Sequence, residues 1–255
     1  MGKIIRKYNL RTFYIITFIV SFLLLPLNFV FQSAGAYSVS FTQFAPALGV
    51  FLIALLLKDP TILQDLKNHL ILNGTGLKWV IPAVAIPSSC ILVTSLILSY
   101  FKINFVPWTG DFAFYMLNAL AILVGCTAEE IGWRGYLLPN LQKRHTPFIS
   151  SLTVGVLWGI WHLNFTGGGL GFILYNVTII EMSILMTWLY NRTNGNLLLM
   201  IIWHFMFNVT SHVFLWDRFN TYLFITETIV FGLMSLYILI ADKKVFLRAP
   251  KVLIN

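Results

Sequence analysis

Eight long apolar stretches dominate this chain of 255 residues. They lie near residues 12–32, 40–57, 79–100, 112–133, 148–165, 171–190, 196–214 and 220–241. A helix that crosses the hydrocarbon core of a bilayer needs about 20 mainly apolar residues, and it satisfies its own backbone polar groups in lipid. The stretches therefore predict an all-α polytopic membrane protein with about eight transmembrane helices.

Composition favours a single membrane domain over residues 1–255. Charged residues make up 10% of the chain, whereas a soluble domain carries about 25%. The longest polar interval runs from Lys58 to Lys78, and no soluble domain is visible. Apolar residues recur at helical spacing within this interval, which predicts a short helix lying on the membrane surface.

The distribution of lysine and arginine predicts the orientation in the membrane, because short cytoplasmic segments collect these residues. With eight spans and the N-terminus inside, all of the 17 except Lys102 and Arg218 fall on the cytoplasmic side. Both termini are then cytoplasmic, and contact with the anionic inner leaflet accounts for the net charge of +8 without a nucleic-acid partner. The cytoplasmic set is Lys3, Arg6, Lys7, Arg11, Lys58, Lys67, Lys78, Arg134, Lys143, Arg144, Arg192, Lys243, Lys244, Arg248 and Lys251.

The stretch TAEEIGWRGYLLP, Thr127 to Pro139, holds the first candidate site. An ionised side chain in hydrocarbon costs at least about 2.5–3.5 kcal/mol, so it needs a partner or a polar cavity. Glu130 and Arg134 are four residues apart, in the order that favours an ion pair on one helix face. Glu129 points about 100° away around the helix and has no obvious charge partner. We therefore interpret Glu129 as the candidate general base and Glu130 as the structural anchor.

Two further pairs stand at helical spacing. Trp158 and His162 share one helix face, and a turn between antiparallel helices brings His162 to the depth of Glu130. A lone histidine in an apolar helix is more often a satisfied core residue than a catalyst. His204 and Asn208 both donate hydrogen bonds, which suits them to a developing oxyanion. The alternative interpretation is that they only join transmembrane helices.

Taken in order, the three pairs resemble the motifs of the CPBP intramembrane proteases, a family that includes the CAAX prenyl proteases and the bacterial Abi group. The family motifs are two glutamates with a later arginine, an aromatic residue four positions before a histidine, and His-x-x-x-Asn. The matching residues are Glu129, Glu130 and Arg134, then Trp158 and His162, then His204 and Asn208. The resemblance indicates a catalytic region of about 112–214.

The resemblance implies an endopeptidase that hydrolyses a peptide bond of a membrane-associated protein or peptide, in the plasma membrane of a prokaryote. Its active site would lie in the helix bundle and open toward the cytoplasm. Glu129 would activate water with help from His162, while His204 and Asn208 would stabilise the oxyanion. The first motif also includes two residues with a structural or substrate-binding role, Glu130 and Arg134.

Cofactor use and two other functions stay open at this point. We favour a metal-free glutamate mechanism, although Glu129, His162 and His204 also fit the His₂Glu ligand set of a zinc protease. A proton-coupled transporter would use Glu129, Glu181 and the histidines as a relay, and a non-proteolytic bacteriocin-immunity protein would keep only the fold. No role follows from the sequence for Glu181 or Glu227.

Overall fold

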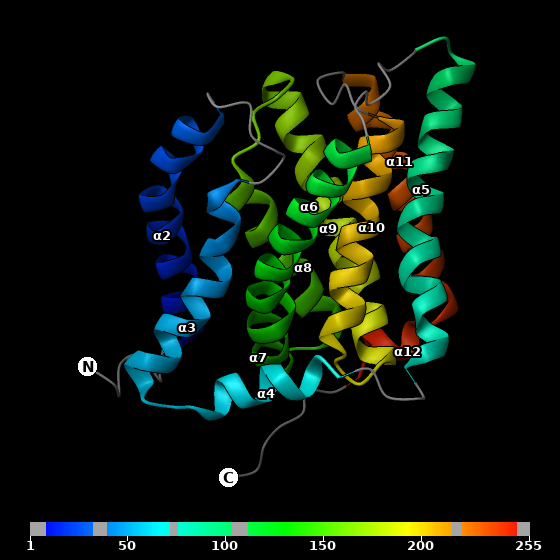
Figure 1. Ribbon diagram of the computed structural model, residues 1–255. Helices are drawn as coiled ribbons and strands as arrows, with labels where there is room; N and C mark the ends of the chain where they lie inside the picture. The colour runs from blue at the N-terminus through cyan, green and yellow to red at the C-terminus, as the bar shows by residue number, and fades with distance from the viewer. Residues whose placement is uncertain (1–8, 33–39, 72–75, 104–111, 216–220, 249–255) are drawn as a thin grey trace.

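A computed structural model describes residues 9–32, 40–71, 76–103, 112–215 and 221–248, and these residues form helices without any strand (Figure 1). The longer helices are α2 (Asn9–Gln32), α3 (Ala45–Leu57), α5 (Val80–Tyr100), α6 (Phe112–Gly132), α8 (Pro147–His162), α9 (Gly168–Arg192), α10 (Leu197–Phe214) and α11 (Thr221–Ala241). The shorter elements are η1 (Phe41–Phe44), α4 (Thr61–His69), η2 (Leu77–Trp79), η3 (Trp133–Leu137), α7 (Leu138–Gln142) and α12 (Lys243–Phe246).

Each of the eight predicted apolar stretches coincides with most of one long helix of the bundle, so the predicted fold class is confirmed. Within the described residues, six helices are long and apolar enough to cross a membrane. The other two, α3 with 13 residues and α8 with 16, are shorter than a full span. The chain is a multi-pass membrane protein, and eight is an approximate count of its spans.

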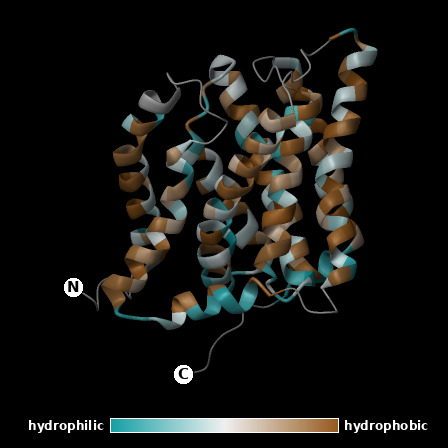
Figure 2. Ribbon diagram, in the orientation of Figure 1, coloured by the Kyte–Doolittle hydropathy of each residue, from teal (hydrophilic) through white to brown (hydrophobic). Residues whose placement is uncertain are grey.

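The long helices stand side by side and alternate in direction, so every second connection lies at the same end of the bundle (Figure 1). Helix α4 lies across one of these ends, where the interval between Lys58 and Lys78 predicts a surface helix. Figure 2 shows apolar residues along the upright helices and mostly hydrophilic ones along α4. Leu66 is the buried residue of α4, so its apolar side packs onto the bundle.

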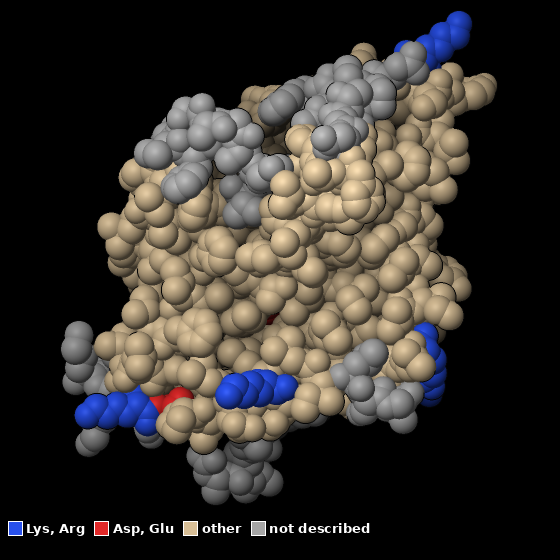
Figure 3. Space-filling model, viewed as in Figure 1, with Lys and Arg blue, Asp and Glu red and all other residues tan. Residues whose placement is uncertain are grey.

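Basic residues gather at the end of the bundle that carries α4. In Figure 3 the Lys and Arg side chains of the visible face lie along this edge and at the far end of α5, and the band between them shows no Lys or Arg. Arg134 is an exception to the predicted cytoplasmic set, because its side chain is fully buried among the helices. The other described basic residues at this end are Arg11, Lys58, Lys67, Lys78, Lys143, Arg144, Arg192, Lys243, Lys244 and Arg248. Five basic residues lie outside the described residues, namely Lys3, Arg6, Lys7, Arg218 and Lys251.

Glycines let neighbouring helices approach closely, as small residues do in membrane bundles. A Cβ atom on Gly132, at the end of α6, would lie 2.3 Å from Cβ of Pro46 in α3. A Cβ atom on Gly155 of α8 would lie 2.7 Å from Cα of Ile180 in α9. The α3–α6 and α8–α9 contacts therefore depend on the absence of a side chain at these positions.

We expect Gly132→Ala to destabilise the protein by about 1–3 kcal/mol, because an added methyl group must push α3 away from α6. Thermal unfolding of the purified protein in detergent measures this effect. Gly169→Ala is the matched control, since a Cβ atom there meets nothing within 4 Å. Equal stability of the two variants would contradict the close α3–α6 packing.

Candidate active site

The acidic pair Glu129 and Glu130 lies in the last turn of α6, directly before a π-helical turn. The π turn, Trp133–Leu137, joins α6 to α7 without a break in the helical path. Pro139 follows it and has no backbone N–H to donate to the carbonyl group four residues earlier. π turns are rare and often occur at functional sites.

Glu130 is the centre of a buried charge network. Its Oε1 atom accepts hydrogen bonds from Nη1 of Arg134 at 2.8 Å and from Nδ1 of His204 at 2.9 Å. The side chains of Glu130 and Arg134 are both 0% exposed. The predicted ion pair is therefore present, and it also includes a histidine from α10, which i to i+4 spacing alone does not predict.

Arg134 also packs against an aromatic ring. Its guanidinium carbon lies 4.1 Å from the ring centroid of Trp158, which is a cation–π contact. Its complete burial between Glu130 and this ring suits a structural role better than contact with a substrate carboxylate.

Glu129 is 1% exposed, and both of its carboxylate oxygens accept hydrogen bonds from neutral groups. Oε2 accepts from the indole Nε1 of Trp158 at 2.9 Å, and Oε1 accepts from Nε2 of Gln43 at 3.0 Å. Among the described residues, the ion pairs within 4 Å do not include Glu129. Its environment thus differs from that of Glu130, as the spacing of the first motif predicts.

His162 is the last residue of α8, and its ring contacts several aromatic residues. Its Nδ1 atom lies 2.8 Å from the carbonyl oxygen of Trp158. Because a carbonyl oxygen only accepts, Nδ1 carries the proton and Nε2 of the neutral ring is an acceptor. The imidazole rings of His162 and His204 both contact Trp158, with centroid distances of 5.7 and 5.2 Å.

His204 and Asn208 lie on one face of α10. Asn208 donates from Nδ2 to the carbonyl oxygen of His204 at 3.3 Å and to the Sγ atom of Cys126 at 3.4 Å. Cys126 is fully buried in α6, so this contact also joins α10 to α6.

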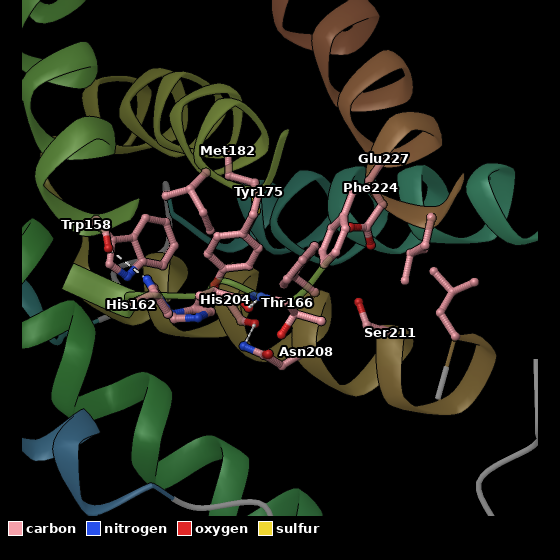
Figure 4. Close-up of a pocket in the computed structure, with 15 residues that line it drawn as sticks. Trp158, His162, Thr166, Tyr175, Met182, His204, Asn208, Ser211, Phe224 and Glu227 are labelled. Carbon is pink, nitrogen blue, oxygen red and sulfur yellow. Dashed lines mark hydrogen bonds between the residues drawn. The ribbon is translucent and has the colours of Figure 1, made fainter. Parts of the chain in front are cut away.

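Two cavities meet at His162. The C-terminal cavity, of about 210 Å³, is lined by His162, His204, Asn208, Ser211 and Glu227 together with aromatic and aliphatic residues of α8 to α11. Figure 4 shows His162, His204 and Asn208 side by side along it, with Ser211 and Glu227 farther from Trp158.

The N-terminal cavity, of about 500 Å³, is lined by Glu129, His162 and Gln43 and by apolar residues that include Phe18, Phe22 and Trp161. The structure therefore brings the candidate residues of all three motifs to the walls of two adjoining cavities, or directly behind those walls.

Both cavities lie toward the end of the bundle opposite α4. Ser40 and Thr42, before the start of α3, line the N-terminal cavity. Asn164 and Thr166, after the end of α8, line the C-terminal cavity together with Glu227 near the start of α11. In Figure 1 these helix ends lie away from α4.

Sequence reasoning missed two polar contacts of the site. Gln43 and Glu129 are 86 residues apart, and no local spacing relates them. The second motif places Trp158 four residues before His162 but predicts no hydrogen bond from its indole N–H, which donates to Glu129. The two other glutamates differ in position. Glu227 lines the C-terminal cavity, whereas Glu181 lies on α9 against Gly232 and lines neither cavity.

We expect Arg134→Ala to destabilise the protein by roughly 3–5 kcal/mol, because it leaves a carboxylate buried with only a histidine partner. Unfolding midpoints and the yield of folded protein in detergent measure the effect. Arg192→Ala is the control. Arg192 pairs with Asp242 and its side chain is 40% exposed, so its loss costs at most about 1 kcal/mol. Similar stability of the two variants would contradict the buried network.

Comparison with known proteins supports the resemblance that the motifs indicate. Residues 111–210 match the family model described as type II CAAX prenyl endopeptidase Rce1-like. A curated relative, CAAX prenyl protease 2 of Methanococcus maripaludis, is 27% identical over 264 aligned positions, which cover 94% of this chain and 96% of the relative. The candidate residues Glu129 to Asn208 all lie in the matched region. The chain is thus similar to the Rce1-like type II CAAX prenyl endopeptidases over residues 111–210, and to the curated relative over most of its length.

Proposed function

We propose that this protein is an intramembrane endopeptidase that hydrolyses a peptide bond of a membrane-associated protein or peptide. The observation that carries the proposal is the position of His162 between two cavities, one lined by Glu129 and the other by His204 and Asn208. A scissile peptide bond at this junction meets a base on one side and hydrogen-bond donors on the other.

Glu129 acts as the general base in the proposed reaction. Its carboxylate takes a proton from a water molecule, and the oxygen of that water attacks the carbonyl carbon of the scissile bond. Nε2 of His162 orients the water, because Nδ1 of that ring is already engaged by the carbonyl group of Trp158. Burial behind the aromatic rings keeps bulk solvent away from the reacting atoms.

His204 and Asn208 stabilise the oxyanion that forms on the carbonyl oxygen. Nδ1 of His204 donates to the carboxylate of Glu130, so the other ring nitrogen donates to the oxyanion only when the ring is doubly protonated, with its positive charge balanced by that carboxylate. Collapse of the tetrahedral intermediate breaks the C–N bond, and Glu129 returns the proton to the leaving nitrogen. The products are a carboxylate and an amine.

A metal-free mechanism is the version that we propose. A zinc ion held by Glu129, His162 and His204 needs all three side chains to converge on one point. Among the described residues, no group of three or more His, Cys, Asp or Glu side chains has such an arrangement. Both oxygens of Glu129 are also engaged by hydrogen-bond donors. The residues as arranged do not fit a zinc ion, and no step is assigned to one.

We expect Glu129→Gln to lower kcat by about 10²–10⁴-fold, because it removes the base without changing the shape of the side chain. The assay follows cleavage of two quenched peptides by the protein in nanodiscs. One peptide ends in a prenylated CAAX sequence and the other is an unprenylated transmembrane peptide. The metal content of the same samples is measured in parallel.

Glu181→Gln is the matched control for this experiment. It removes a half-buried carboxylate of a membrane helix, but one that lines neither cavity, and it should keep wild-type activity. Full activity of Glu129→Gln would contradict the mechanism. Stoichiometric zinc together with inhibition by chelators would restore the metal-dependent alternative.

For the location we propose the plasma membrane of a prokaryote, with both termini in the cytoplasm. The basic residues at the end that carries α4 support this orientation. The two cavities then open on the opposite side of the membrane, because the residues at their mouths lie at the other ends of the helices. The resemblance implies that the active site opens toward the cytoplasm. An active site that opens to the cytoplasm and cytoplasmic termini therefore exclude each other in this structure.

Labelling of single cysteines with a membrane-impermeant maleimide tests the orientation. We expect Gly169→Cys, at the cavity end, to react in intact cells, and Lys67→Cys on α4 to react only after permeabilisation. The native Cys90 and Cys126 are buried and provide a low background. The reverse pattern would place the cavity mouths, and both termini, on the sides opposite to those proposed.

A further inference from the structure

We infer that Gln43 is a positioning residue for the Glu129 carboxylate. This inference rests on the proposed function of Glu129 as the base. Gln43 belongs to η1, between α2 and α3, and lies outside the region 111–210 that matches the family model. Its Nε2 atom lies 3.0 Å from Oε1 of Glu129. The N-terminal part of the chain thereby contributes to a site whose motif residues all come from later helices.

The orientation of the Gln43 amide is fixed by its second hydrogen bond. The backbone N–H of Ser40 donates to Oε1 of Gln43 at 3.2 Å. An N–H group needs an acceptor and a carboxylate needs a donor, so only this orientation of the amide satisfies both neighbours. The amide therefore links a fixed backbone group to Glu129 and presents an N–H donor to it.

A polar network holds η1 against α2. Asn28 accepts a hydrogen bond from the backbone N–H of Phe41 at 2.6 Å and donates to Oγ of Ser40 at 2.7 Å. Asn28 is only 8% exposed, although it lies in an apolar helix. The contacts from α2 thus fix the backbone that in turn fixes the Gln43 amide.

Gly125 provides the space that the amide occupies. A Cβ atom on this residue of α6, one turn before Glu129, would lie 2.6 Å from Oε1 and 3.0 Å from Nε2 of Gln43. Such distances are shorter than van der Waals contact. The absence of a side chain at Gly125 therefore lets the Gln43 amide pack against α6, where it reaches the Glu129 carboxylate.

The two donors to Glu129 come from opposite parts of the chain. Gln43 engages Oε1 and Trp158 engages Oε2, so rotation of the carboxylate breaks one bond or the other. Each oxygen keeps a further lone pair for water. The charged and titratable groups that interact electrostatically with Glu129 are Arg134 from η3, His162 from α8 and His204 from α10.

The test compares Gln43→Met and Gln43→Glu in the cleavage assay, with kcat and KM determined separately. Methionine keeps the size of the side chain but removes the donor. We expect kcat to fall about 10–100-fold, as for other outer hydrogen bonds to a reacting group, while KM changes less than about twofold. In Gln43→Glu the new carboxyl group faces Glu129, so the kcat deficit of this variant should depend on pH, whereas that of Gln43→Met should not.

A double-mutant cycle gives a second measurement that does not depend on the methionine variant. Gly125→Ala should lower kcat because it displaces the amide, and it should have little further effect in a Gln43→Ala background. An undiminished effect in that background would show that Gly125 acts without Gln43. Gln64→Met on α4, where the glutamine is exposed and bonded to Asn68, is the matched control and should keep wild-type kinetics.

The outcomes separate this inference from the proposed function. An active wild type, an inactive Glu129→Gln variant and a fully active Gln43→Met variant would overturn the positioning role alone. Parallel losses in kcat for Gln43→Met and Gly125→Ala, with wild-type unfolding midpoints, would support it. Absence of cleavage by the wild-type protein would overturn the proposed function and this inference together.

Discussion

The burial of a carboxylate and a guanidinium within the helix bundle is the constraint on which the rest of the site depends. Two charges withdrawn from water cost several kcal/mol each unless their hydrogen bonds are satisfied by well-placed partners. Oε1 of Glu130 accepts from Arg134 in the next turn and from His204 on α10, whereas Oε2 has no hydrogen-bond partner among the described residues. The bond between Glu130 and His204 holds the register of α10 against α6, and with it the place of the candidate oxyanion donors.

Trp158 connects the buried ion pair to the rest of the site. Its indole N–H donates to Glu129, and its ring face receives the guanidinium of Arg134. The same ring contacts the imidazoles of His162 and His204. One aromatic side chain thus touches four of the candidate residues. These contacts explain why the second motif carries a large aromatic residue four positions before its histidine. Tryptophan adds a hydrogen-bond donor that phenylalanine lacks.

The features that could be predicted from the sequence are those that depend on local spacing along the chain. Apolar runs marked the helices, and the four-residue spacing between Glu130 and Arg134 identified a pair that the structure contains. Contacts between distant segments were not predictable in this way. The approach of Gln43 to Glu129 depends on how α2 and α3 pack, and the length of α8 depends on its termination at Leu163, which has a left-handed backbone with φ of 47°. The roles of the site residues stay predictions.

The π turn after the acidic pair has a consequence for the length of the chain. A π turn accommodates one residue more than the α turn that it replaces. Removal of one residue from Trp133–Leu137 would therefore restore an α turn without rotating the segment that follows. The buried Leu138 and Leu141 would keep their direction, whereas side chains within the turn, Arg134 among them, would shift. The same deletion within the regular α turns of α6 would rotate everything beyond it by about 100°. The π turn is thus the point of this helix at which a change in residue number disturbs the following core least.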